Sequence, residues 1–187
     1  IPASLGELRS TAILPQSSEA KFPWPAGGTF QRSQGWHSTN AIDFASSDNH
    51  AMLAVADGRV VEVCQDQYQR IFSLQTSLGT FRYIHLDWAT SNLNLNNQNV
   101  SRGRYLGQLY NGTAKVKPVC SESLCGPNGC KANTTCGCLS GPHIHLEFPS
   151  TNTVIDGHVA NNIAINGGNY TSSNVRIDSS GVVDGPR

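Results

Sequence analysis

Two histidines stand two residues apart within residues 140–148, and this stretch is the part of the chain best suited to chemistry. In an extended strand, His143 and His145 point to the same face, so two nitrogen ligands or bases share one small space. Ile144 and Leu146 point to the opposite face, which gives the alternation of a strand with one buried and one functional side. Two ordinary surface histidines would show the same pattern. The function must therefore be argued together with residues elsewhere in the chain.

A carboxylate interrupts a second apolar stretch, which follows a polar loop containing His37. Asp43 lies between Ile42 and Phe44, and a buried carboxylate needs a partner because an unpaired buried charge is costly. A metal ion would be one such partner. The alternative is that Ile42 and Phe44 face the core while Asp43 faces water.

A third histidine ends a predicted strand. Residues 70–75 and 80–86 flank a short turn and predict a hairpin. Strict alternation would put Tyr83 and His85 on one face of the second strand and Leu86 on the other. A single histidine beside aromatic residues at a strand end is more often a packing residue than a catalyst.

Further short strands are expected on both sides of these segments. Residues 51–64 predict two strands joined as a hairpin by a turn at Asp57 and Gly58. Glycines and short apolar pieces in residues 100–110 favour another strand pair. Residues 151–187 predict short strands and loops.

The chain has six cysteines, and five of them lie within 19 residues that contain too few apolar side chains to form a core. Disulfides formed in an oxidising compartment are favoured over a structural zinc knuckle, because paired C-x2-C spacings are missing. The sequence does not choose among the possible pairings. The cysteines are Cys64, Cys120, Cys125, Cys130, Cys136 and Cys138.

A length of 187 residues predicts one domain, spanning 1–187. Residues 1–21 are expected to form an N-terminal arm lying over it. The core is expected at residues 22–150, with a cysteine-rich insert at 113–139, and the C-terminal strands and loops follow at 151–187.

Charge and hydropathy argue against two classes of partner. The formal net charge is +0 and there is no run of Lys or Arg, so neither nucleic acid nor an anionic membrane surface is an expected partner. No stretch approaches about 18 consecutive apolar residues, so no membrane-spanning segment is expected. The chain begins Ile1-Pro2-Ala3, without an initiator Met or a signal peptide, which favours a processed, mature and secreted protein.

Several short motifs resemble, in the same order, those of the lysostaphin-type zinc metallo-endopeptidases, the group that includes LasA and lysostaphin. The resemblance covers about residues 22–148. The motifs are Trp36-His37, Ile42-Asp43-Phe44-Ala45, Ala56-Asp57-Gly58 with Val60, Tyr83-Ile84-His85-Leu86, Val100 and Gly103 with Leu106-Gly107, and Ser140-Gly141-Pro142-His143-Ile144-His145-Leu146-Glu147.

The resemblance implies a mainly β fold whose antiparallel sheet forms a groove, and one zinc ion per chain. It makes His37, Asp43 and His145 the zinc ligands. Two histidines and a carboxylate, with the fourth position left to water, form a hydrolytic arrangement because zinc lowers the pKa of the water and polarises a carbonyl.

The resemblance also makes His85 and His143 catalytic histidines beside the metal, and Tyr83 matches a tyrosine of the family. The implied reaction is attack of zinc-bound water on a peptide carbonyl. One histidine would accept the proton of the water and the other would stabilise the oxyanion, and which does which stays open. The implied substrates are glycine-rich peptides, in peptidoglycan cross-bridges or elastin, and a monomer is expected.

Two features depart from the family pattern. Five residues separate His37 from Asp43, more than in many members, so Asp48, His50 and Asp57 are rival ligands. The cysteine-rich insert is not part of the common pattern and is expected to form a wall of the groove. The alternative functions are a catalytically inactive cell-wall-binding module and an adhesion β domain, which metal content would distinguish from the enzyme.

Overall fold

The computed structural model describes residues 19–37, 40–47, 51–65, 69–87, 95–110, 142–178 and 181–183. The predicted cysteine-rich insert, most of the predicted arm, Asp48 and His50 lie outside these ranges. The elements are β1 Thr29–His37, β2 Ala41–Ala45, β3 Ala51–Leu53, β4 Gly58–Gln65, β5 Gln69–Thr76, β6 Gly79–Asp87, β7 Asn99–Val100, β8 Tyr105–Gln108, β9 His143–Glu147, β10 Val154–Ile155, β11 His158–Val159, α1 Ala160–Asn166, β12 Asn169–Thr171, β13 Arg176–Asp178 and β14 Gly181–Val183.

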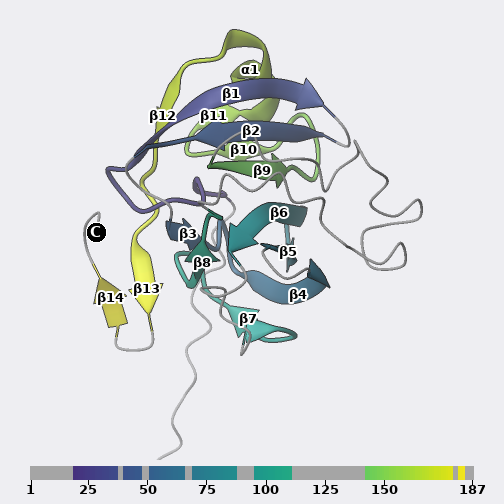
Figure 1. Cartoon of the computed structure of the whole chain (residues 1–187), viewed down its shortest axis with the longest axis vertical. Helices are drawn as coiled ribbons and strands as arrows, with labels where there is room; N and C mark the ends of the chain where they lie inside the picture. Colours follow the sequence, from purple (N-terminus) through teal and green to yellow (C-terminus); the bar gives the residue numbers. More distant parts are fainter. Residues whose placement is uncertain are drawn as a thin grey trace, which may run out of the picture.

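Eight of the strands form one sheet, in the order β12-β1-β2-β9-β6-β5-β4-β7. Every pair of neighbours in it is antiparallel. Figure 1 shows that β9, which follows β8 by a long stretch of chain, lies between β2 and β6. The prediction of a mainly β protein with an antiparallel sheet is confirmed.

The strand pairing corrects two of the sequence predictions. The hairpin of β5 and β6 is confirmed, with a turn at Ser77 and Leu78. The hairpin around Asp57 and Gly58 is wrong, because β3 pairs with β8 whereas β4 pairs with β5 and β7. A Cβ atom at Gly58 would overlap the carbonyl oxygen of Gln75, so this glycine serves close strand pairing rather than a turn. The strand pair expected in residues 100–110 is wrong for the same reason, since β7 and β8 pair with different strands.

The prediction of strands and loops for residues 151–187 is wrong at residues 160–166, which form helix α1. It has seven residues, buries Ala160, Ile163 and Ala164, and has no side-chain cap at its N-terminus. So short a helix completes about two turns, which leaves little 3.6-residue periodicity in the sequence. It lies beside β1 (Figure 1), and no helix in the described residues is long and apolar enough to cross a membrane.

The core lies on one face of the sheet and is rich in aromatic side chains. The Trp24 ring stacks on Phe22 at 4.6 Å and on Phe30 at 4.3 Å between ring centroids. Both Phe22 and Trp24 are fully buried. The Pro-flanked segment before β1 therefore inserts its aromatic residues under the sheet, because stacked rings bury large apolar areas.

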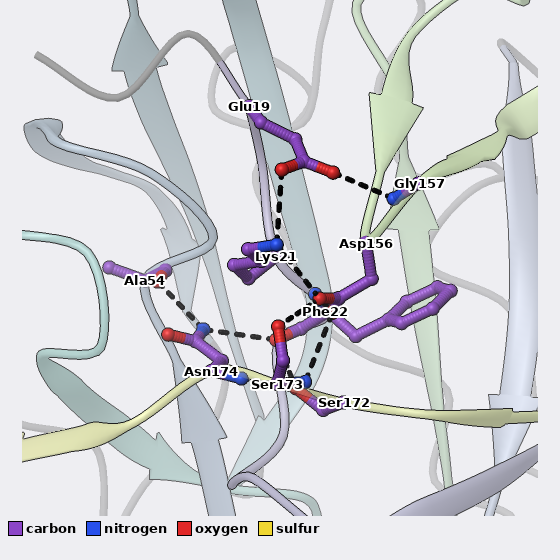
Figure 2. Close-up of polar contacts among 9 residues, drawn as sticks. All are labelled: Glu19, Lys21, Phe22, Ala54, Asp156, Gly157, Ser172, Ser173 and Asn174. Atoms are coloured by element: carbon purple, nitrogen blue, oxygen red, sulfur yellow. Dashed lines mark hydrogen bonds and ion pairs between the residues drawn. The ribbon is translucent and has the colours of Figure 1, made fainter.

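Polar contacts bind this N-terminal segment to two C-terminal segments (Figure 2). The Phe22 N–H donates to Asp156 Oδ2 at 2.7 Å, and Lys21 Nζ lies 3.3 Å from Asp156 Oδ1. Asn174 Nδ2 donates to the Phe22 carbonyl oxygen at 3.0 Å and to the Ala54 carbonyl oxygen at 3.1 Å. These bonds satisfy buried backbone groups where the two ends of the described chain meet over the core.

Gly103 and Gly157 offer a matched test of this packing. Both have positive φ, +85° and +77°, but a Cβ at Gly103 would overlap the Val175 carbonyl oxygen whereas none of the described atoms lies within 4 Å of one at Gly157. We expect Gly157→Ala to lower the free energy of unfolding by about 1 kcal/mol through backbone strain alone. Gly103→Ala should lower it by about 3 kcal/mol, since overpacking adds to the strain. Denaturant unfolding of both variants measures this, and equal losses would contradict the close contact at Gly103.

Candidate metal centre

The pairing of β2 with β9 places three polar side chains on one face of the sheet. Asp43 lies directly opposite His145, and Ala45 lies opposite His143. The prediction that the two histidines share a face is confirmed. Asp43 does not face open water, because only 8% of its surface is exposed.

The apolar neighbours of these residues point the other way. Ile42, Phe44, Ile144 and Leu146 are fully buried in the core. Since side chains alternate along a strand, their burial directs Asp43, His143 and His145 to the opposite face.

Two irregularities in β1 place His37 beside Asp43. The register moves from Arg32 opposite Phe44, through Gln34 opposite Asp43, to His37 opposite Ala41, so five steps along β1 match three steps along β2. Regular pairing from Arg32 would place Gly35 opposite Ala41 and His37 two residues beyond it. His37 lies on the Asp43 face, because Ala41 and Asp43 share a face of β2, and such repositioning of a side chain is a common use of bulges.

His37, Asp43 and His145 form a compact group that can hold a metal ion. His37 Nε2 lies 3.0 Å from His145 Nδ1 and 3.3 Å from Asp43 Oδ1. His145 Nδ1 lies 3.0 Å from the same carboxylate oxygen. His37 Nδ1 lies 2.7 Å from the Gly35 carbonyl oxygen, which can only accept, so this nitrogen donates a hydrogen bond and Nε2 is the nitrogen that faces the group.

The group fits a tetrahedral metal such as zinc. Ligand atoms at about 2.0–2.1 Å from a tetrahedral zinc would lie about 3.3 Å from one another, close to the three separations observed. Asp43 Oδ1 is buried and accepts no hydrogen bond from the described residues. A carboxylate oxygen beside two imidazole nitrogens needs a cation or a proton between them, and a metal ion would satisfy all three atoms.

A second bulge, in β6, positions His85. Phe72 pairs with Tyr83 and Arg70 with Leu86, so β6 has one residue more than β5 in this interval. The prediction that Tyr83 and His85 share a face opposite Leu86 is wrong, because the extra residue places Tyr83 and Leu86 together in the core. His85 has a φ of +76°, a conformation rare in non-glycine residues.

Beside the metal group, His85 and His143 form a pair. Their ring centroids are 4.7 Å apart, and the His85 ring lies 6.3 Å from that of His145. His143 Nε2 is 3.7 Å from Asp43 Oδ2, the carboxylate oxygen that is not part of the ligand group. Burial, and then the neighbouring His143 and His145, lower the pKa of His85 well below its ordinary value, so its imidazole is neutral near pH 7.

Two of the residues singled out in the sequence are not brought to this group. Tyr83 is buried in the core, where its hydroxyl accepts a hydrogen bond from the Val55 N–H at 2.9 Å. Burial raises the pKa of Tyr83 above its ordinary value. Asp57 Oδ1 instead accepts a hydrogen bond from the Arg102 N–H at 2.7 Å. The rivals Asp48 and His50 lie outside the described residues.

Glu147 ends the motif of residues 140–147, but no role was predicted for it from the sequence. It follows His145 by two residues, and its Oε1 lies 3.9 Å from His145 Nε2. The spacing, which puts the two on one face of a strand, was the signal that could have identified it.

Two comparisons with known proteins give no match. No protein-family model matches the sequence, and neither does any curated protein. What bears on function is therefore the site itself, a His-Asp-His group that can hold a metal ion with two further histidines beside it.

The positive φ of His85 leads to a stability prediction. His85→Ala and His85→Asn both remove the ring contacts, but Asn tolerates the left-handed region better than Ala. We expect His85→Asn to unfold with a free energy about 1 kcal/mol higher than His85→Ala, and His85→Gly to resemble the Asn variant. Urea unfolding of the three metal-free variants measures the difference. An Ala variant as stable as the other two would contradict the conformation at this position.

Proposed function

We propose that the chain is a secreted zinc-dependent endopeptidase that hydrolyses glycine-rich peptide bonds. The observation that carries the proposal is that one face of the sheet holds a group of three possible metal ligands and, beside it, two histidines outside that group. A purely structural zinc site would use four protein ligands. Three ligands, with proton-transferring groups beside them, favour hydrolysis.

His37, Asp43 and His145 would hold one zinc ion per chain. Imidazole nitrogens and a carboxylate oxygen suit zinc, and the three are spaced as a tetrahedral ion requires. When bound, zinc would lower the pKa of a water molecule and polarise the substrate carbonyl.

His143 and His85 would handle the proton and the developing charge. The His143 side chain keeps 13% of its surface exposed, so it can contact substrate and exchange a proton with water. His85 is 3% exposed and neutral, so an N–H of its ring could donate a hydrogen bond to the oxyanion without carrying a charge of its own. We therefore assign proton acceptance to His143 and oxyanion stabilisation to His85.

The substrate class follows from the resemblance to lysostaphin-type endopeptidases. Their glycine-rich substrates, in peptidoglycan cross-bridges or elastin, have little side-chain bulk and would suit a narrow groove over the sheet. The cysteine-rich insert would form a wall of this groove. Disulfides among its cysteines, as the sequence predicts, would agree with secretion, and the enzyme would act as a monomer.

Metal removal tests the proposal directly. We expect the purified chain to contain one zinc ion, measured by atomic emission, and to cleave pentaglycine with release of new amino termini. Chelation should abolish cleavage, and added zinc should restore it, because the carbonyl is not polarised without the metal. Parallel assays on elastin and on cell walls with glycine cross-bridges would identify the preferred substrate. Absence of both zinc and cleavage would overturn the proposal in favour of an adhesion domain, and cleavage that survives zinc removal would overturn the metal mechanism.

The different positions of His143 and His145 give a second prediction. We expect His145→Ala to lose zinc, because it removes one of the three ligands. His143→Ala should keep zinc and lower kcat/KM by about 10²- to 10⁴-fold through loss of proton transfer. Zinc content and pentaglycine cleavage are measured on the same samples, with His158→Ala as a control at an exposed histidine outside the group. Equal zinc content in the His143 and His145 variants would contradict the ligand assignment.

A further inference from the structure

The two histidines of the metal group use opposite ring nitrogens. His37 faces the group with Nε2, and His145 faces it with Nδ1. A neutral imidazole that gives one lone pair to a metal carries its proton on the other nitrogen. For His37 that proton lies on Nδ1 and is donated to the Gly35 carbonyl oxygen. For His145 it must lie on Nε2.

Among the described residues, the Nε2 atom of His145 has no such acceptor within hydrogen-bond distance. It is buried and makes no hydrogen bond with the described residues, and the same is true of Glu147 Oε1. The two atoms lie 3.9 Å apart, which is longer than a hydrogen bond. A buried donor and a buried acceptor therefore face each other, each lacking the partner that the other would supply.

Glu147 is held in this place from its other side. Its Oε2 lies 3.3 Å from Arg82 Nη1, and the pairing of β6 with β9 puts Arg82 directly opposite Glu147. The ion pair orients the carboxylate, with Oε1 as the oxygen nearest His145 Nε2. The Arg82 side chain is more exposed than that of Glu147, so Arg82 lies on the solvent side of the ion pair.

We propose that Glu147 is a positioning residue for the metal, which accepts a hydrogen bond from His145 Nε2–H and so fixes Nδ1 as the ligand atom. Closing the separation to about 2.9 Å requires only a small rotation of the glutamate side chain. The hydrogen bond would orient the ring and make Nδ1 a stronger donor to the metal. The inference rests on the metal site of the proposed function, but not on the substrate.

The experiment measures zinc affinity by competition with a chromophoric chelator, without any activity assay. Glu147→Met, similar in size but without an acceptor, should weaken zinc binding by about 10- to 100-fold. Glu147→Gln keeps a neutral acceptor oxygen and should bind with intermediate affinity. The cobalt-substituted Met variant should show an altered visible spectrum, since the His145 ring is no longer held in one orientation.

Variants of Arg82 test whether the effect of Glu147 on zinc binding comes only from its ion pair with Arg82. We expect Arg82→Met to weaken zinc binding less than Glu147→Met does, because Glu147 keeps its acceptor oxygen, and Arg82→Met/Glu147→Met to bind as weakly as Glu147→Met alone. Thermal unfolding of the chelated proteins reports the stability of each variant separately. Wild-type affinity in Glu147→Met, or its recovery in the double variant, would overturn the inference while leaving the zinc site in place. A wild-type chain that binds no zinc would overturn both.

Discussion

The site depends on the register between β2 and β9. The two strands form one apolar face and one polar face, and a slip of one residue would exchange them. Ile42, Phe44, Ile144 and Leu146 lie in the core, and each contributes about 1.5–3 kcal/mol on burial. That burial holds Asp43 opposite His145 far more firmly than contacts between the polar groups themselves could. The hydrophobic core thus determines which side chains meet on the opposite face.

Bulges in the two flanking strands complete what the regular register begins. The two irregularities in β1 place His37 beside Asp43, and the bulge in β6 directs His85 to the Asp43 face, so β2 and β9 are flanked by one bulged strand on each side. A bulge disrupts part of the ladder, and the positive φ of His85 adds backbone strain of about 1–2 kcal/mol. The packed strands around them hold these costly conformations, which gather where the proposed chemistry takes place.

The difference between regular register and bulges also separates what could be predicted from the sequence from what could not. Alternation along a strand correctly grouped His143 with His145 and separated Asp43 from its apolar neighbours, because period-2 burial is a local property. It misplaced His85 and Leu86, since a bulge depends on the partner strand and leaves no period-2 signal. The turn at Asp57 and Gly58 was misassigned likewise, because β3 finds its partner in β8, about fifty residues along the chain. The grouping of His37 with Asp43 and His145 came from the family resemblance, and the two irregularities in β1 give it a structural cause.

The polar face also has to be stable before any metal binds. Asp43, His145 and Glu147 are all buried, and an isolated buried charge would cost several kcal/mol. Glu147 is compensated by Arg82, and His37 by the Gly35 carbonyl oxygen, whereas Asp43 Oδ1 accepts no hydrogen bond from the described residues. Asp43 Oδ1, like His145 Nε2 and Glu147 Oε1, is thus a buried polar atom that lacks a hydrogen bond from the described residues. A cation bound by Asp43 would relieve part of this electrostatic cost, so metal binding and folding stability are coupled through Asp43.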